Sequence, residues 1–258
     1  EKLLYYSVSI PSMEENKNKT TLYVTPIVGG NASVIADMPS GANITIEKGG
    51  ENSKISPDGK KVIFTREVKV QKVFGQDYDP SYVKSNTHIY DGLNQRHWDT
   101  WEDGFYSHVF IADVVAGFAI REKDIMEGDL YDSPQKPFGG EEDILFSPDG
   151  QKVLYVCKKK TGTEYAISTN TDIYVYDIAT GSTENITEDR KGYDMSPIFS
   201  ADGSKLAWLS MPREGFEADK NELWMMDWAT KGKQCITQSF DETVSSFRWT
   251  ANNQSIYF

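Results

Sequence analysis

Apolar and polar positions along this chain form short runs separated by turn residues, and one such pattern returns four times. The copies occupy residues 55–64, 146–155, 199–208 and 249–258. In each copy an apolar residue precedes the turn, and apolar residues follow three, four and five places after its Gly or Asn. The turn sequence is Ser-Pro-Asp-Gly in its most complete copies. Pro fixes its own φ at about −65°, the Asp side chain accepts hydrogen bonds from nearby amides, and Gly tolerates positive φ. The pattern therefore predicts four β-hairpins that belong to a repeat.

The spacing of the copies gives the size of the repeat. Ser147 and Ser200 are 53 positions apart, Ser200 and Thr250 are 50 apart, and Ser56 and Ser147 are 91 apart. The period is therefore near 50 residues, with an insertion of about 40 in one unit. We expect one domain or domain fragment with repeat units at about residues 1–47, 48–127, 140–190 and 191–240 and a partial unit at 241–258. The insertion is placed at residues 71–104.

The first unit differs from the others because no turn motif precedes it. Strands are predicted at residues 3–10, 21–25 and 32–35, with Gly29 and Gly30 turning the chain. That makes three strands of a four-stranded unit. Because the chain begins inside a strand without Met, we expect the N-terminus to have been cut or processed within a repeat.

Alternation within the third unit shows how the sheets pack. Ile173 and Val175 lie on one face of a predicted strand and Tyr174 and Tyr176 on the other, so both faces are apolar. Such a sheet needs a neighbour on each side, and four short strands per repeat of this length are typical of a β-propeller blade. The fold class expected is therefore all-β, a partial or truncated β-propeller of about four blades of four antiparallel strands, with one insertion that lies largely outside the repeat.

Two further points of the fold stay open at this stage. A β-sandwich is the weaker alternative, because its turns come closer together and its strands do not repeat as text. The blade number permits either a segment of a larger propeller or a small ring in which the two terminal fragments share one blade.

The net charge, the cysteines and the apolar runs of the chain bear on which kinds of partner and site it can have. The formal net charge of −12 leaves no basic stripe for a nucleic acid. Cys157 and Cys235 fall in predicted strands and are expected to be ordinary buried thiols. No apolar run reaches about 18 residues, the length that a membrane-spanning helix needs. Nothing in the sequence calls for a cofactor.

The repeat also resembles a known family. A Phe-Ser-Pro-Asp-Gly hairpin with a closing Ile-Thr is similar to the blades of TolB-type propellers and of the propeller domains of the prolyl-oligopeptidase family. Within the insertion, the run 90–101 contains Arg-His-Trp-Asp-Thr-Trp at residues 96–101. It resembles a segment of dipeptidyl peptidase V and acylaminoacyl-peptidase-like enzymes.

The resemblance implies a non-catalytic propeller that caps an α/β-hydrolase domain and limits access to its active site. The whole protein would then be a periplasmic or secreted serine exopeptidase. Its peptide substrate would contact both this propeller and a C-terminal hydrolase domain. The Gly-x-Ser-x-Gly sequence that the family uses for its nucleophile does not occur here, so no catalytic residue is assigned to this chain. The alternative is a stand-alone TolB-like propeller that binds protein partners.

Candidate substrate-binding residues lie in the insertion, because insertions on rigid scaffolds commonly carry function. They are Arg96, Trp98, Asp99, Trp101, Glu102 and Asp103. In this interpretation a carboxylate pairs with a peptide ammonium and the tryptophans pack apolar side chains. Related enzymes of the dipeptidyl peptidase IV type use a Glu pair on a propeller insertion, and the run 101–103 departs from that pattern.

A structural interpretation of the same residues is favoured over the functional one. Trp98 and Trp101 stand three residues apart, which places them on one face of a short helix packed on the propeller. Burying two tryptophans contributes on the order of 5 kcal/mol at ~25 cal/mol per Å². Arg96 and Asp99 would then form a local ion pair.

The remaining candidates are interpreted as structural. The three histidines, His88, His97 and His108, match no metal-ligand spacing, so no metal site is predicted. The acidic run 141–143 is expected to be a solvated face. The aspartates that follow apolar runs just before turns are expected to cap those turns; they are Asp113, Asp177 and Asp227.

Overall fold

The computed structural model describes residues 3–11, 18–26, 33–34, 52–115 and 118–258. In the first unit, β1 (Leu3–Pro11) pairs antiparallel with β2 (Asn18–Pro26), and β2 pairs with β3 (Ser33–Val34). The turn predicted at Gly29 and Gly30 lies outside the described residues.

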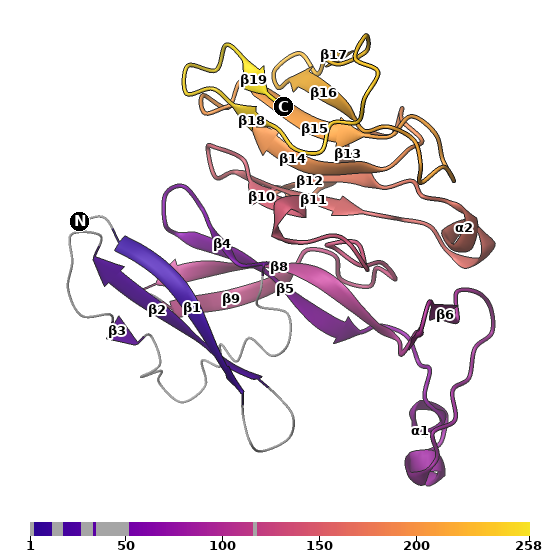
Figure 1. Cartoon of the computed structure of the whole chain (residues 1–258). Coiled ribbons are helices and arrows are strands. Elements are labelled where there is room, and N and C mark those ends of the chain that lie inside the picture. The colour runs from indigo at the N-terminus through magenta and orange to yellow at the C-terminus, as the bar shows by residue number, and fades with distance from the viewer. Residues whose placement is uncertain (1–2, 12–17, 27–32, 35–51, 116–117) are drawn as a thin grey trace.

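The second unit is a four-stranded antiparallel sheet that carries the insertion between its two middle strands. Its strand order is β4 (Lys54–Ile55), β5 (Lys61–Lys69), β8 (Phe105–Val115) and β9 (Phe118–Asp124). The insertion contains α1 (Gly75–Tyr78), the 3-10 helix η2 (Pro80–Lys84), β6 (Arg96–His97) and β7 (Thr100–Trp101). It projects from one end of the sheet (Figure 1).

The third and fourth units repeat the same sheet, and a two-stranded sheet follows them. The third contains β10 (Ile144–Phe146), β11 (Lys152–Cys157), β12 (Asp172–Asp177) and β13 (Thr183–Asn185), with the 3-10 helix η3 (Glu141–Asp143) before β10 and α2 (Gly162–Ile167) between β11 and β12. The fourth contains β14 (Asp194–Phe199), β15 (Lys205–Ser210), β16 (Glu222–Asp227) and β17 (Lys233–Cys235). The last sheet pairs β18 (Arg248–Trp249) with β19 (Ile256–Tyr257).

These sheets stand face to face as successive blades, so the fold is a β-propeller (Figure 1). Each complete blade connects its strands in sequence order. Among the described strands, β18 and β19 pair only with each other and not with β1, β2 or β3. No strand pairing among the described residues therefore joins the last sheet to the first unit.

The Ser-Pro-Asp-Gly text folds into the predicted hairpins through its own side chains. In the β10–β11 turn, Asp149 Oδ1 accepts hydrogen bonds from Ser147 Oγ at 2.5 Å and from the Gln151 amide at 3.0 Å. Ser147 Oγ in turn accepts from the Lys152 amide at 2.9 Å, and Gly150 has φ +70°. The turns before β5 and β15 repeat these contacts through Asp58 and Asp202. The residues of the motif therefore stabilise their own tight turn by hydrogen bonds to one another.

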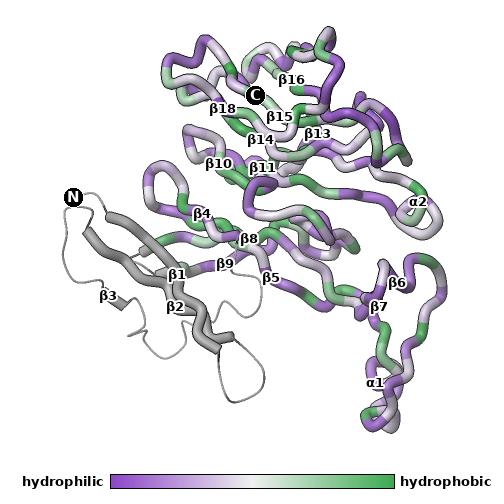
Figure 2. Tube along the Cα trace, viewed as in Figure 1, coloured by the Kyte–Doolittle hydropathy of each residue, from purple (hydrophilic) through white to green (hydrophobic). Residues whose placement is uncertain are grey.

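The core lies between the blades, and alternate residues of a strand belong to different interfaces. Ile173 and Val175 pack with Leu206 and Trp208 of the fourth blade. Tyr174 and Tyr176 of the same strand pack in the cluster that contains Ile63 of the second blade. This confirms the prediction that both faces of a blade are covered by neighbours, and Figure 2 shows the apolar stretches concentrated along the strands.

Asp177 and Asp227 cap their turns as predicted, whereas Asp113 forms ion pairs with Lys61 and Arg121, and of the two cysteines only Cys157 is buried as predicted. Asp177 Oδ1 accepts from the Thr180 amide at 2.9 Å, and Asp227 Oδ1 accepts from the Thr230 amide at 2.8 Å. Asp113 pairs with Lys61 at 2.7 Å. Both cysteines are free thiols, with Cys157 buried and Cys235 half-buried. No helix of the described residues is long and apolar enough to cross a membrane.

Candidate functional site

The insertion is closed at its base by backbone contacts, which hold it at one end of the second blade. The amides of Val70 and Gln71 both donate to the Gly104 carbonyl, at 2.9 and 3.2 Å. Gly104 has φ +82°, and a Cβ there would stand 2.1 Å from the Gln71 carbonyl oxygen. Only glycine fits this position without a shift of the backbone.

The run 96–101 is a hairpin, so the helix predicted for it is wrong. β6 pairs with β7, and the register places Arg96 opposite Trp101. Trp98 lies in the turn with φ +51° and is 65% exposed, and Trp101 is 52% exposed. The predicted burial of both tryptophans is therefore also wrong. Spacing of three suits a helix face, but cross-strand contacts decide the local structure here.

Aromatic stacking gives the physical reason for the hairpin. The rings of His88, Tyr90 and Trp101 form a cluster, with centroids 6.2 Å apart for Trp101 and Tyr90, 6.1 Å for His88 and Tyr90, and 6.4 Å for His88 and Trp101. The Arg96 guanidinium lies over the Trp101 ring at 5.5 Å. In the described part of the chain Arg96 forms no ion pair with Asp99, so the expected Arg96–Asp99 pair is replaced by this cation–π contact.

A large hollow of about 840 Å³ opens beside the hairpin. It lies between the insertion, the segment around Phe138, α2 and the connection from β15 to β16. Arg96, His97 and Trp98 form one wall, and Trp98 meets Phe138 edge to face at 5.5 Å. Of the six predicted binding residues, Arg96 and Trp98 line this hollow.

A small hollow of about 150 Å³ adjoins the large hollow, and Asn94 and Tyr165 line both. Three carboxylates lie on its wall, from Asp91, Glu102 and Asp132. Of the predicted residues, only Glu102 reaches the small hollow. Burial raises the pKa of Glu102, and Asp132 nearby adds to the rise.

Asp132 is held in place by the backbone and by one lysine. It is buried, and its Oδ1 accepts from the Ser107 amide at 2.8 Å and pairs with Lys136 Nζ at 3.1 Å. Lys136 also pairs with Glu67 at 2.9 Å. Burial nevertheless raises the pKa of the Asp132 carboxyl above its ordinary value. The wall of the small hollow therefore carries three carboxylates against one lysine, Lys160, whose Nζ lies 3.9 Å from a Glu214 carboxylate oxygen.

The remaining predicted residues lie outside both hollows. Asp103 accepts from the Phe105 amide at 2.9 Å and so caps the start of β8. Asp99 stands in the exposed hairpin turn, where its carboxylate accepts from Thr100 Oγ1 at 3.5 Å. Trp101 belongs to the aromatic cluster described above.

Sequence reasoning missed the residues that other blade connections bring to the same end. Asp132 and Gln135 follow β9, and Lys158 and Tyr165 follow β11. The available signal was their position, because each follows a predicted strand at the end that also carries the insertion. Of the histidines, His108 is buried and its Nδ1 lies 2.7 Å from Asp124 Oδ2, His88 belongs to the aromatic cluster, and His97 lies on the wall of the large hollow. Within the described ranges, no group of three His, Cys, Asp or Glu side chains could hold a metal ion.

Comparison with known proteins places the chain in a family. No family model matches the sequence. Dipeptidyl-peptidase 5 from Porphyromonas gingivalis is 42% identical over 203 residues, which cover 79% of this chain and 29% of that protein. Dipeptidyl-peptidase 5 from Porphyromonas endodontalis is 34% identical over 261 residues, covering 87% of this chain and 38% of that protein. The chain is a propeller of the prolyl-oligopeptidase family.

This prolyl-oligopeptidase-family propeller spans about a third of the length of the curated relatives it matches. Among solved structures, TolB from Acinetobacter baumannii matches with a TM-score of 0.45 and 17% identity, covering 89% of this chain and 40% of that one. A prolyl endopeptidase structure matches with a TM-score of 0.48 and 16% identity, covering 85% of this chain and 26% of that one.

Proposed function

We propose that this chain is the non-catalytic propeller of a periplasmic or secreted serine dipeptidyl peptidase. In this proposal the propeller limits access to an active site on a separate hydrolase domain and contacts the N-terminus of the peptide substrate. The observation that carries the contact role is the position of Glu102, a half-buried carboxylate on the wall of a small hollow next to the insertion hairpin.

The chemistry of the small hollow suits a primary ammonium group. Its volume of about 150 Å³ corresponds to roughly five waters at ~30 Å³ each, which is room for a terminal ammonium with a small substituent. Asp132 already has a lysine partner in Lys136, whereas Glu102 makes no ion pair in the described part of the chain. A peptide ammonium would supply the missing positive charge, because an opposite charge nearby favours ionised Glu102.

The proposed limit on access rests on the arrangement of loops. The insertion, α2 and the connection from β15 to β16 gather at one end of the propeller around the two hollows (Figure 1). A folded protein would not pass between them, whereas an extended peptide N-terminus would reach the wall that holds Glu102. Loops on a rigid scaffold are suited to this selection.

The test uses the full-length protein that contains this chain. Glu102→Gln should raise the KM for a dipeptidyl reporter at least tenfold, with a smaller change in kcat, because binding of the free amine is lost before chemistry begins. Glu184→Gln on the exposed strand β13 is the matched control and should leave both constants unchanged.

Two outcomes would contradict the proposal. Equal KM values for the Glu102→Gln variant and the unaltered protein would remove the ammonium site. Failure of the full-length protein to react with a fluorophosphonate label would remove the serine peptidase and favour an interaction propeller.

A further inference from the structure

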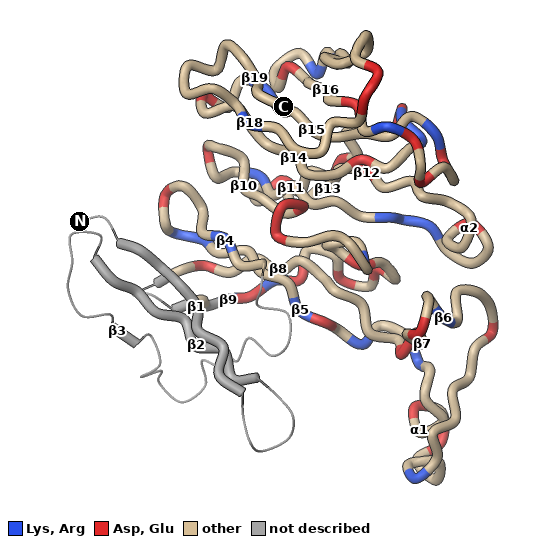
Figure 3. Tube along the Cα trace, in the orientation of Figure 1, with Lys and Arg blue, Asp and Glu red and all other residues tan. Residues whose placement is uncertain are grey.

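The large hollow has an excess of positive charge that the proposed ammonium site does not use. Its wall includes three basic side chains, Arg96, Lys136 and Lys158, and one carboxylate, from Glu217. This is the opposite of the chain as a whole, whose net charge is −12. In Figure 3 a blue stretch lies between β11 and α2, where residues 158–160 are all lysines and Lys158 lines the hollow.

The three basic residues differ in what they contact. Lys136 is already paired with Glu67 and Asp132. Lys158 Nζ donates to the Tyr165 carbonyl at 2.7 Å and lies 4.2 Å from the centre of the Tyr165 ring, and its contacts include no ion pair with a described carboxylate. The Arg96 guanidinium lies over the Trp101 ring at 5.5 Å. Two cations therefore stand at the large hollow without a carboxylate partner among the described residues.

An unpaired, partly desolvated ammonium favours a bound anion. Burial lowers the pKa of Lys158, and the carboxylates of Glu214 and Glu217 offset this only in part. A carboxylate in the hollow would offset that cost, because charge-assisted hydrogen bonds are stronger than neutral ones. Guanidinium and ammonium groups are both suited to a carboxylate.

Exposed apolar side chains form another part of the wall, beside polar residues that include Asn94, Gln135 and Thr171. Trp98 is 65% exposed, Phe138 is 74% exposed and Ile167 at the end of α2 is 69% exposed. Large apolar side chains in this number beside a hollow are typical of a binding site rather than of a solvated surface. The ligand should therefore combine a carboxylate with an apolar portion.

We propose that the large hollow binds an acidic side chain, next to an apolar one, of a peptide. The carboxylate would contact Lys158 and Arg96, and the apolar side chain would pack on Trp98 and Phe138. The choice of a peptide rests on the function proposed above, since the large hollow adjoins the small hollow through Asn94 and Tyr165. A peptide with its amine near Glu102 would place following side chains in the large hollow.

The experiment measures binding of two acetylated peptides to the full-length protein by calorimetry at low salt. The peptides are acetyl-Glu-Phe-amide and acetyl-Gln-Phe-amide, which differ only in the charge of one side chain. We expect the Glu peptide to bind at least tenfold more tightly. Lys158→Met should abolish this ratio and Lys158→Arg should retain it, which separates loss of charge from loss of fold. Lys84→Met, on the exposed helix η2, is the control and should leave the ratio unchanged.

The outcomes separate this site from the ammonium site. Acetylated peptides have no terminal amine, so the result does not depend on Glu102. Equal binding of the two peptides, or a ratio that survives in both Lys158→Met and Arg96→Gln, overturns the carboxylate site. If free glutarate displaces the Glu peptide at an equal concentration, the site recognises small carboxylates and the peptide assignment is overturned.

Discussion

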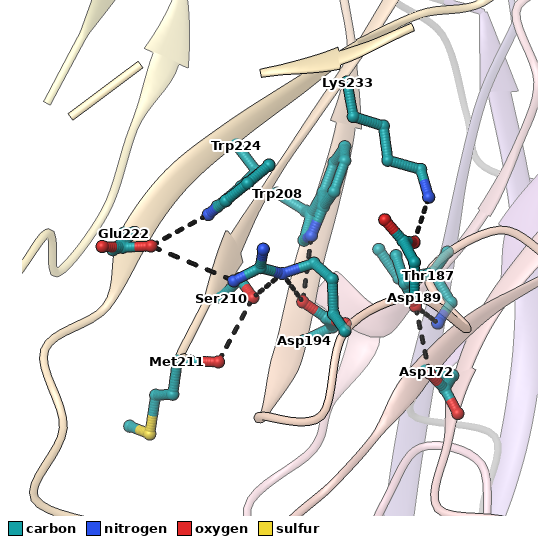
Figure 4. Close-up of polar contacts among 12 residues, drawn as sticks. Asp172, Thr187, Asp189, Asp194, Trp208, Ser210, Met211, Glu222, Trp224 and Lys233 are labelled. Carbon is teal, nitrogen blue, oxygen red and sulfur yellow. Dashed lines mark hydrogen bonds and ion pairs between the residues drawn. The ribbon is translucent and has the colours of Figure 1, made fainter. Parts of the chain in front are cut away.

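The indole Nε1 of Trp208 donates a hydrogen bond to Asp194 Oδ1 at 3.0 Å, and both side chains are fully buried in the fourth blade. Figure 4 shows the carboxyl group beside Trp208 and Ser210. Arg190 Nε lies 3.7 Å from the same oxygen, whereas Asp194 Oδ2 has no hydrogen-bond partner among the described residues. Burial raises the pKa of Asp194 to about 7. Asp194 is therefore a buried carboxyl group that stays protonated in the folded protein below about pH 7.

This raised pKa predicts a pH dependence of stability. In the unfolded chain Asp194 titrates near pH 4, so between about pH 4 and pH 7 the folded protein holds a proton that the unfolded chain has lost. The contribution of this group to the free energy of unfolding is complete below about pH 4. It falls by about 1.4 kcal/mol per pH unit as the pH rises toward 7.

Asp194→Asn should remove this slope, because the amide does not titrate. Urea unfolding followed by tryptophan fluorescence, at several values between about pH 5 and pH 8, would measure it. Glu184→Gln, on the exposed strand β13, should keep the slope of the unaltered protein. Parallel pH profiles for Asp194→Asn and the unaltered chain would show that the carboxyl does not retain its proton in the folded state.

The blade hairpins could be predicted because their determinants are local. Ser147 and Asp149 hydrogen-bond within a single turn in which Gly150 adopts positive φ, and the same chemistry recurs at each copy. The face-to-face packing followed as well, because a strand apolar on both sides needs two neighbours. Tyr174 and Val175 lie in different clusters for that reason.

The candidate site could be predicted only in part, because it is built from segments distant in sequence. Glu102, Asp132 and Tyr165 come from three separate connections and meet only through the arrangement of the blades. The hairpin at 96–101 was missed for another reason. Its register places Arg96 against Trp101, and a spacing of three between the tryptophans does not reveal that pairing.

Gly150 provides a test of the turn chemistry. Its φ is +70°, and a Cβ there would meet Pro57 at 3.6 Å, so conformation rather than space is the constraint. Gly150→Val should lower the free energy of unfolding by about 1–3 kcal/mol through enforced positive φ. Gly150→Asn should cost less, since Asn tolerates this region and already occupies it at Asn253. Equal urea midpoints for the Val and Asn variants would contradict this account of the turn.

The Ile-Thr pair that closes the third and fourth units has a structural role that can also be tested. Thr187 Oγ1 accepts from the Ile173 amide at 2.9 Å, and Thr237 Oγ1 accepts from the Leu223 amide at 2.8 Å. Both threonines are buried. Thr187→Val or Thr237→Val keeps the shape but leaves a buried N–H unpaired, which should cost about 1–3 kcal/mol each.

The matched control is Thr180→Val, at an exposed turn position. It should cost less than either buried variant in the same urea titration. The two buried changes lie in different blades, and the hydrogen bonds they remove have no residue in common, so their effects should add within about 0.5 kcal/mol. A cost at Thr180 as large as at Thr187 would show that the buried amides are not the cause.

Trp98 and Trp208 provide a comparison between a tryptophan proposed to bind a ligand and a tryptophan that packs in the core. Trp98 is 65% exposed in a turn, whereas Trp208 is fully buried between blades. Trp98→Ala should change the free energy of unfolding by no more than about 0.5 kcal/mol, as at other exposed positions. Trp208→Ala should cost about 3–5 kcal/mol, because it leaves a cavity in the core and removes the hydrogen bond to Asp194.

Urea unfolding of the two variants, compared with the unaltered chain, gives the answer directly. If Trp98→Ala costs more than about 2 kcal/mol, the indole contributes to packing and its assignment as an exposed binding residue is contradicted. A small cost at Trp98 combined with weaker binding of acetyl-Glu-Phe-amide has a different meaning. The fold does not need this exposed indole, so a loss confined to binding assigns it to the ligand that packs in the large hollow.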